Sequence, residues 1–184
     1  MTTAFLKAVE KTLLFEGGFS NDPEDPGNWT GGKKGVGELK GTNHGISAMM
    51  FPDEDIANVS TEKARRLYYE RFWKPLNLDL VTADRAPVAD LAFDINVNQG
   101  PAEQLLQGAL ILLGHDIKLD GIVGPKTISA LNSDKNWRDV YELLLTMRRM
   151  LWLVGAASVD EIILMIKPRK EHIRRYMRGW MTRR

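Results

Sequence analysis

The feature that most constrains this chain is an apolar helical repeat near its N-terminus that ends abruptly at a carboxylate. Phe5, Val9 and Leu13 recur every four residues, which is the spacing of one face of an α-helix. Glu16 falls on the same face, and Gly17-Gly18 directly after it is typical of a helix end. A carboxylic acid on a buried stripe needs a partner or a proton, and burial favours the protonated form that a general acid requires. The sequence therefore predicts a functional carboxyl group here; the alternative is a glutamate at a frayed helix end that points into water.

A turn-rich acidic segment follows this helix. Residues 21–27 combine Asn, Asp, Pro and Gly, which are the residues that form turns, so several carboxylates return near Glu16. Glycoside hydrolysis commonly uses one protonated carboxyl group and one ionised carboxylate on opposite sides of a sugar. A solvated loop aspartate that faces a half-buried helix glutamate supplies such a pair. Alternatively, the side chains of Asp22 and Asp25 cap their own turns.

Several motifs resemble a known enzyme family. Residues 16–27 and 42–47 resemble the glycoside hydrolase family 108 N-acetylmuramidases, which are lysozyme-like enzymes of phage endolysins and secretion-activator proteins. Residues 93–101, 120–127 and 179–183 resemble the predicted peptidoglycan domain that accompanies these enzymes. The resemblance covers nearly the whole chain and implies a lysozyme-like fold that acts on peptidoglycan.

The same resemblance implies roles for individual residues. The glutamate of the Glu-Gly-Gly motif is the catalytic acid of the family, and this role carries over to Glu16. Asp25 lies nine residues later, as in the Glu–Asp pair of phage-type lysozymes. Thr42 sits where a threonine of those enzymes helps to hold the attacking water. The expected catalytic residues are therefore Glu16, Asp25 and Thr42, with Asp22 as a substrate contact or the second carboxylate; no metal and no cofactor is implied.

Six further side chains are candidates for substrate binding. Asn43 and His44 lie inside the family-like motif, where His44 would line the cleft.

Tyr69 and Trp73 are aromatic and lie one helical turn apart, so they would form a sugar-stacking wall, although core packing is the commoner fate of such a pair. Asn98 and Gln99 are amides at a helix end, which suit N-acetyl groups and sugar hydroxyls or else cap the helix.

Helical signals continue along the chain, and strand signals are nearly absent. We expect a mainly α fold, with at most a small β-hairpin within residues 28–47 and an α-helical C-terminal lobe. The expected lobes are residues 1–95, which are lysozyme-like, and residues 96–184, which bind peptidoglycan. Capping and periodicity predict helices at 60–73, 87–97, 102–113, 125–131, about 137–154 and 169–182, with a break at 98–101. The apolar stretch 150–166 is expected to be buried helix.

Composition narrows the classes of function. A chain of 184 residues can bury one good core, and its formal charge of +1 gives no global attraction to nucleic acid or to membranes. Because there is no cysteine, disulfide scaffolds, thiolate metal sites and cysteine nucleophiles are excluded. The three histidines show no metal-ligand spacing. We expect a monomer whose partner is the peptidoglycan glycan strand, with no stable membrane insertion.

Two segments and the N-terminus carry further expectations. The glycine-rich residues 28–41 are expected to be a mobile flap over the cleft, or else a solvated loop. The last helix has a basic face that would be weakly attracted to anionic wall or lipopolysaccharide, while its apolar face closes the lobe. Residues 1–15 lack the pattern of a signal peptide, so we expect synthesis in the cytoplasm and delivery to periplasmic peptidoglycan by a holin or a dedicated export route.

The predicted function is that of an endolysin-type muramidase. The resemblance implies cleavage of the β-1,4 bond between N-acetylmuramic acid and N-acetylglucosamine, with Glu16 as general acid. One rival is a lytic transglycosylase, which needs the glutamate but no carboxylate that activates water. The other rival is a wall-binding secretion accessory protein without catalytic activity.

Overall fold

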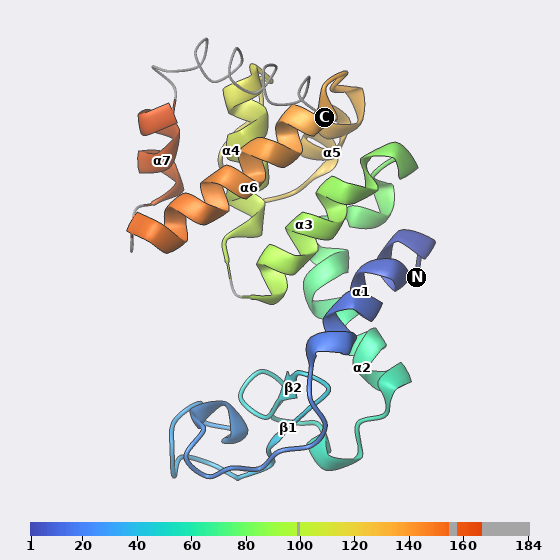
Figure 1. Ribbon diagram of the computed structural model, residues 1–184, viewed down its shortest axis with the longest axis vertical. Coiled ribbons are helices and arrows are strands. Elements are labelled where there is room, and N and C mark those ends of the chain that lie inside the picture. Colours follow the sequence, from blue (N-terminus) through green and yellow to red (C-terminus); the bar gives the residue numbers. More distant parts are fainter. Residues whose placement is uncertain (99, 155–157, 167–184) are drawn as a thin grey trace. The chain divides into compact units, whose positions relative to one another are not determined.

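The computed structural model describes residues 1–98, 100–154 and 158–166, and the chain forms two compact units, residues 1–71 and 72–184 (Figure 1). Within the described residues, helices dominate and one two-stranded antiparallel hairpin forms the sheet, which confirms the predicted mainly α fold. The helices and strands are α1 (Thr3–Phe15), β1 (Thr42–Asn43), β2 (Ile46–Ser47), α2 (Thr61–Tyr68), α3 (Ala86–Val97), α4 (Ala102–Leu113), α5 (Pro125–Ser133), α6 (Trp137–Val154) and α7 (Val159–Ile166).

Helix α1 forms as its periodicity predicts, but it ends one residue before the carboxylate. The Thr2 hydroxyl caps its first turn by accepting a hydrogen bond from the Phe5 N–H (3.4 Å). Phe5 and Val9 are completely buried, so they are the inner face of the helix. Glu16 has extended backbone angles (φ −82°, ψ 137°) and is exposed. The structure therefore differs from the predicted place of Glu16 on the buried stripe, because the extended residue turns its side chain out of the helical repeat.

The β-hairpin lies within the segment where it was predicted. Thr42 pairs with Ser47, and Asn43 pairs with Ile46, so two residues make the turn. These are His44 (φ 51°) and Gly45 (φ 72°), and two consecutive positive φ angles are typical of the tight hairpin turn that matches strand twist. The strand that carries Thr42 is bonded on its other side to Ser20 by two backbone hydrogen bonds (2.7 and 2.8 Å). The hairpin thus fastens the chain just after Glu16.

Helix α2 closes the first unit. The Ser60 hydroxyl accepts a hydrogen bond from the Lys63 N–H (3.2 Å), as the predicted N-cap requires. The helix continues into a π-helical turn over Tyr69–Trp73, which confirms the predicted helix over 60–73. An ion pair between Arg65 and Glu10 (2.7 Å) joins α2 to α1.

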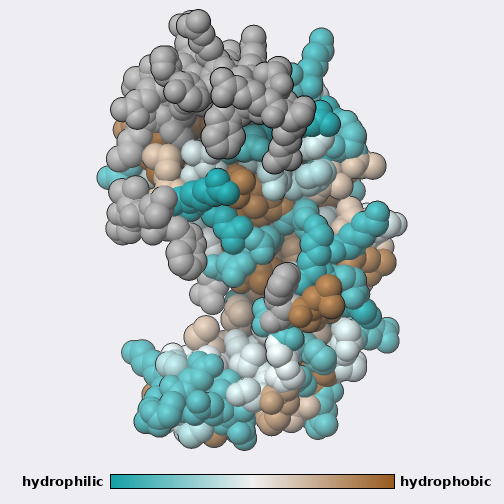
Figure 2. All heavy atoms as spheres, viewed as in Figure 1, coloured by the Kyte–Doolittle hydropathy of each residue, from teal (hydrophilic) through white to brown (hydrophobic). Residues whose placement is uncertain are grey.

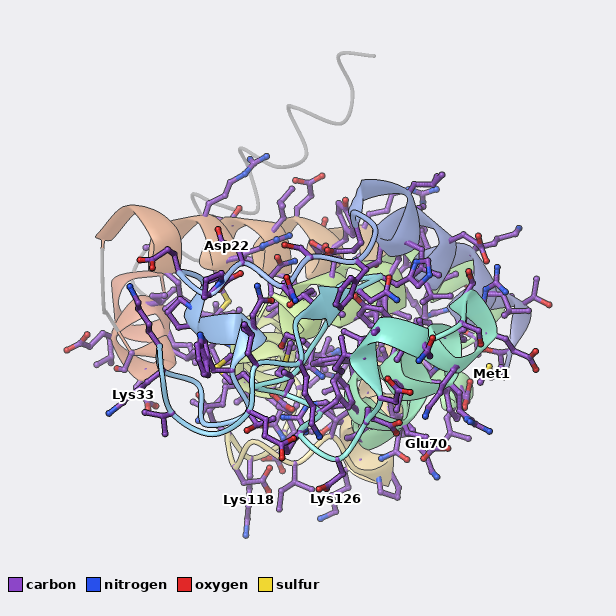
Figure 3. The ribbon with its side chains drawn as sticks, turned by 90° about the horizontal axis from the view of Figure 1, so that it is seen from below. Met1, Asp22, Lys33, Glu70, Lys118 and Lys126 are labelled. Atoms are coloured by element: carbon purple, nitrogen blue, oxygen red, sulfur yellow. The ribbon has the colours of Figure 1, made fainter. Side chains whose placement is uncertain are left out.

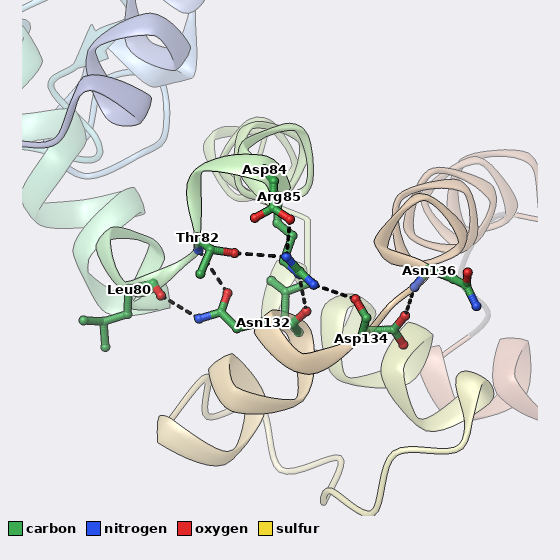
Figure 4. Close-up of polar contacts among 8 residues, drawn as sticks. Leu80, Thr82, Asp84, Arg85, Asn132, Asp134 and Asn136 are labelled. Atoms are coloured by element: carbon green, nitrogen blue, oxygen red, sulfur yellow. Dashed lines mark hydrogen bonds and ion pairs between the residues drawn. The ribbon is translucent and has the colours of Figure 1, made fainter.

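The second unit is an α-helical bundle in which α4 packs against α3, α5, α6 and α7. A polar cluster joins the start of α3 to the end of α5 (Figure 4). Arg85 donates to the carbonyl oxygens of Leu131 (2.9 Å) and Asp134 (2.7 Å), and the Asn132 side chain accepts from the Thr82 N–H (3.0 Å). Carbonyls at a helix end have no partner within the helix, so this arginine caps α5 from outside.

The Asp120-Gly121 turn, which lies in the motif at residues 120–127, is held by one buried amide. Gln107 is 1% exposed, and its oxygen accepts hydrogen bonds from the N–H groups of Asp120 (3.1 Å) and Gly121 (2.9 Å). Its nitrogen donates to the Asp120 carboxylate (2.8 Å) and to the Ile122 carbonyl (3.0 Å). This glutamine therefore fixes the conformation of the motif, which makes the motif a structural element of the second unit.

The remaining expectations meet the structure in different ways. The apolar stretch 150–166 is helical at both ends, but α6 ends at Val154 and α7 starts at Val159. The helix predicted at 169–182 lies outside the described residues. The predicted lobes 1–95 and 96–184 stay a prediction. The boundary between the two compact units lies between residues 71 and 72 of the sequence. In the described part of the chain, no helix combines the length and the apolar character needed to cross a membrane.

Candidate active site

The carboxyl group of Glu16 lies against the turn of the hairpin. A Cβ atom placed on Gly45 would lie 2.7 Å from Glu16 Cδ and 2.2 Å from Tyr68 Oη. Real Cβ atoms essentially never come so close, so only a glycine at position 45 lets the carboxyl group and the phenol both lie against the backbone of the turn. In the two residues that follow Glu16, a Cβ atom on Gly17 or Gly18 would meet nothing within 4 Å among the described residues. Glu16 is itself exposed, so its carboxyl group lies against the hairpin turn and is accessible to a ligand.

Tyr68 supports this corner of the site from helix α2. It is 2% exposed, and its hydroxyl donates a hydrogen bond to the His44 carbonyl oxygen (3.2 Å). Burial raises the pKa of the Tyr68 phenol, and the negative charge of Glu16 raises it further. The phenol therefore stays protonated and keeps its hydrogen on the turn that faces Glu16.

A second set of hydrogen bonds ties the acidic loop to the open end of the hairpin. The Thr42 hydroxyl donates to the side-chain oxygen of Asn28 (2.7 Å), and the Asn28 amide nitrogen donates to the Asp22 carbonyl oxygen (3.0 Å). Asn28 is 1% exposed, and its own carbonyl accepts from the N–H groups of Lys40 and Gly41 (both 3.0 Å). Because the Thr42 hydroxyl donates its hydrogen to Asn28, the Thr42 oxygen can accept further hydrogen bonds, for example from water.

Both predicted loop carboxylates cap their own turns. Asp22 accepts from the Glu24 N–H (2.9 Å), and Asp25 accepts from the Gly27 N–H (2.8 Å) at the start of the short 3-10 turn Pro26–Asn28. Both side chains are exposed, and among the described residues neither Oδ2 atom takes part in a hydrogen bond. One oxygen of each carboxylate therefore stays available beside the hairpin. Glu16 lies at the turn of the hairpin, whereas these aspartates lie near its open end.

The Asn43 side chain is buried and forms hydrogen bonds within the protein. Its side chain is 6% exposed, and its amide nitrogen donates to the carbonyl oxygens of Ile56 (3.2 Å), Ala57 (3.3 Å) and Val59 (3.4 Å). The amide group that the sequence suggested for substrate binding is therefore used to fasten the segment after the hairpin to strand β1.

The aromatic pair does not form an exposed wall. Trp73 is completely buried in the second unit, where its ring meets Phe93 edge to face (5.6 Å between centroids) and its indole N–H donates to Asp79 (2.9 Å). Tyr69 belongs to the first unit and packs edge to face on Phe5 (5.2 Å). The core-packing alternative therefore describes Trp73, because no face of its ring is left for a sugar.

The remaining candidates are placed as follows. The Asn98 amide donates to the Asp94 carbonyl (2.8 Å) and carboxylate (3.2 Å), as expected of a residue that caps the end of α3. Gln99 lies outside the described residues. His44 is half-buried in the hairpin turn, and the role of its ring in the cleft stays a prediction.

The glycine-rich loop is closely hydrogen-bonded and borders the acidic loop. Thr30 and Glu38 exchange two hydrogen bonds (both 2.9 Å), and Lys34 pairs with Glu24 (2.5 Å). In Figure 3, the loops that carry Asp22 and Lys33 lie on one side of the first unit, away from Met1 and Glu70. This loop end of the unit is mostly hydrophilic on the face that Figure 2 shows. The predicted mobility of residues 28–41 stays a prediction.

Comparison with known families shows which protein family the chain belongs to. A family model described as "Glycosyl hydrolase 108" matches residues 9–100, and one described as "Predicted Peptidoglycan domain" matches residues 101–184. The chain belongs to glycosyl hydrolase family 108. The family makes the protein a glycosidase, and the companion domain makes peptidoglycan its ligand, so the two together describe a peptidoglycan hydrolase.

A solved structure supports the fold of this family 108 member. The chain is similar to the structure of Brucella abortus SagA, with a TM-score of 0.59 and 22% sequence identity over 91% of this chain and 94% of that chain. At this identity the similarity concerns the fold alone. A search of curated proteins found no match.

Three residues that organise this family 108 site were missed by the sequence analysis: Asn28, Gly45 and Tyr68. Gly45 is the one with a readable signal, because it lies in a two-residue turn between short strand-like segments. Asn28 and Tyr68 look ordinary in the sequence, since their roles depend on contacts with residues 14 and 24 positions away. Among the described residues, no group of three or more histidine, aspartate and glutamate side chains is placed to hold a metal ion.

Proposed function

We propose that this glycosidase is an N-acetylmuramidase that cleaves the β-1,4 bond between N-acetylmuramic acid and N-acetylglucosamine. The observation that carries the proposal is the place of Glu16, an exposed residue whose carboxyl group lies against Gly45 in the hairpin turn. An exposed carboxyl group at this place is within reach of the glycosidic oxygen of a glycan strand laid over the turn. We propose that Glu16 protonates that oxygen as it leaves.

The second half of the proposed reaction needs a water molecule on the other face of the sugar. Asp25 and Thr42 are the residues that we propose to hold it, with Asp22 as the alternative carboxylate. The free Oδ2 of an aspartate accepts one hydrogen of that water, and the Thr42 oxygen accepts the other. An ionised aspartate at this place also stabilises positive charge at the anomeric carbon.

The turn-capping bonds of Asp22 and Asp25 favour one competing function. A lytic transglycosylase uses the glutamate alone, and the muramic acid 6-hydroxyl takes the place of water. In that case both aspartates would serve the turns only, as one oxygen of each does here.

The products separate the two functions. Purified sacculi are digested to completion, and the soluble muropeptides are analysed by mass spectrometry with and without borohydride reduction. A muramidase leaves reducible N-acetylmuramic acid ends, which gain two hydrogens on reduction. Anhydro-muramic ends, which are lighter by one water and do not react with borohydride, would show a transglycosylase.

We also propose that the enzyme acts on periplasmic peptidoglycan after a holin or a dedicated route has released it. The substrate lies outside the inner membrane, so cytoplasmic enzyme cannot reach it. Expression of the protein alone in a Gram-negative host should leave the culture density unchanged, and co-expression with a holin should cause lysis. Lysis that is equally fast without the holin would contradict this route.

A further inference from the structure

The first unit contains a pocket that the catalytic proposal does not use. Its volume is about 410 Å³, and it is open to solvent. Its lining consists of Phe19, Leu39, Lys40 and residues 53–57. All of these residues belong to the unit that carries Glu16.

Two parts of this lining are fixed to strand β1 and to Gly41 beside it. On one side, the backbone bonds between Ser20 and Thr42 hold the residue next to Phe19, whose ring edge would lie 2.8 Å from a Cβ atom on Gly41. On the other side, the buried Asn43 amide holds the carbonyls of the 56–59 segment. The pocket is therefore preformed, because Gly41 and the two residues of strand β1 next to it fix the positions of Phe19 and of the 56–59 segment.

The pocket is also close to Glu16 along the hairpin. Phe19 of its lining contacts the chain at Gly41, and Glu16 contacts the hairpin at Gly45. The two contacts are four residues apart, which at ~3.3 Å per residue is at most about 13 Å. The pocket is thus a neighbouring position to the bond that Glu16 addresses.

The lining of the pocket combines an aromatic ring with hydrogen-bond acceptors. Phe19 is 48% exposed, so a large part of its ring faces solvent. Asp53 and Asp55 are exposed at the rim, and among the described residues the Asp53 carboxylate forms no hydrogen bond or ion pair. A sugar ring has an apolar face that packs on an aromatic ring and hydroxyl groups that donate to carboxylates.

The charge of the rim selects among sugars. Glu54 forms an ion pair with Lys63. Lys40 donates a hydrogen bond to the Pro52 carbonyl oxygen (2.7 Å) and forms an ion pair with Glu38 (3.4 Å). The carboxylates of Asp53 and Asp55 are therefore in excess and repel a negatively charged ligand. In peptidoglycan, the N-acetylglucosamine unit is neutral, whereas the N-acetylmuramic acid unit carries a peptide with carboxylate groups.

We propose that this pocket binds an N-acetylglucosamine unit of the glycan strand and rejects peptide-bearing N-acetylmuramic acid, an inference that rests on the proposed glycosidase function. Phe19 supplies the stacking surface, and Asp53 and Asp55 supply both the acceptors and the discrimination.

The test measures binding apart from catalysis. All proteins carry Glu16→Gln in the full chain, and titration calorimetry compares the N-acetylglucosamine tetramer with a muramyl tetrapeptide. Adding Phe19→Ala should weaken tetramer binding about tenfold. Leu6→Ala is the matched control, because Leu6 is 41% exposed in the same unit and does not line the pocket; it should change nothing.

A second variant keeps the test independent of any change in folding. Asp53→Asn with Asp55→Asn changes only exposed side chains, so the melting temperature should hold. The variant should bind the muramyl tetrapeptide several-fold better relative to the tetramer than the parent does. Unchanged tetramer binding in Phe19→Ala would overturn the proposal, as would a muramyl peptide that the parent prefers to the tetramer. If instead the Glu16→Gln parent still degraded sacculi while these binding effects held, the catalytic proposal alone would fail.

Discussion

The carboxyl group of Glu16 and the Cα atom of Gly45 lie in such close contact that no side chain fits between them. This contact joins the end of helix α1 to the turn of the hairpin. It gives the catalytic proposal a physical basis that sequence spacing cannot supply, because a carboxyl group at a helix end is otherwise free to point into water.

Gly45→Ala should inactivate the enzyme. The added methyl group would meet both Glu16 and Tyr68, so the carboxyl group must move. The backbone also has φ 72°, where an alanine costs roughly 1–2 kcal/mol. We expect a lower melting temperature and a loss of lysis of at least ~100-fold, comparable to the loss of one general acid.

Gly35→Ala is the matched control for that variant. Gly35 has nearly the same φ (76°), but a Cβ atom there meets nothing within 4 Å among the described residues. It should lose similar stability and keep its activity. Equal activities of the two variants, measured as clearing of sacculi suspensions, would mean that the contact with Glu16 does not matter.

The raised pKa of Tyr68 predicts how stability depends on alkaline pH. The unfolded chain releases the phenol proton near pH 10, whereas the folded protein keeps it to higher pH. The stabilisation is therefore complete below about pH 10 and is lost as the pH rises toward the folded-state pKa, with a slope of about 1.4 kcal/mol per pH unit. Denaturant titrations between pH 9 and 11 should show that the stability of wild type relative to Tyr68→Phe falls with that slope above about pH 10.

Asp25→Asn should reduce the rate of lysis more than Asp22→Asn. The Asn side chain keeps the oxygen that accepts the turn hydrogen bond in both cases, so the melting temperatures should change little. Only the residue that holds water or stabilises charge should then affect the rate, and we expect this to be Asp25. A slow Asp22 variant beside a normal Asp25 variant would reverse the assignment.

Shortening the glycine-rich loop tests whether it contacts substrate. Residues 31–37 are replaced by Asn-Gly, which joins Thr30 to Glu38 in a two-residue turn and keeps their hydrogen bonds. Affinity for glycan strands should fall because Lys33 and Lys34 are lost, and the melting temperature should shift by no more than about 3 °C, near 1 kcal/mol at this size. A large fall in melting temperature at unchanged affinity would show that the loop holds the unit together instead.

The helices of this protein were predictable because their signals are local. Apolar periodicity predicted α1, and Ser60 predicted the start of α2. The place of Glu16 was predicted one step too far into the helix, because the extended backbone of a single residue decides whether a side chain follows the helical repeat. Periodicity does not contain that information.

The site was less predictable than the fold because its contacts are long-range. The sequence indicated the carboxylates and Thr42, but the partner of Thr42 is the buried amide of Asn28. The reverse holds for Trp73 and Asn43, whose chemistry suits a sugar but whose polar atoms serve the protein's own interior. Residue type shows what a side chain can bind, and burial decides whether a ligand can reach it.

Glu16→Gln is the most direct test of the central claim. The change keeps the shape of the side chain and removes the transferable proton, so lysis of sacculi should fall by about 10²–10⁴-fold. The melting temperature and the binding of the protein to intact sacculi should stay at wild-type values. A Glu16→Gln protein that keeps more than about a tenth of the wild-type lytic rate would contradict the assignment of Glu16 as the general acid.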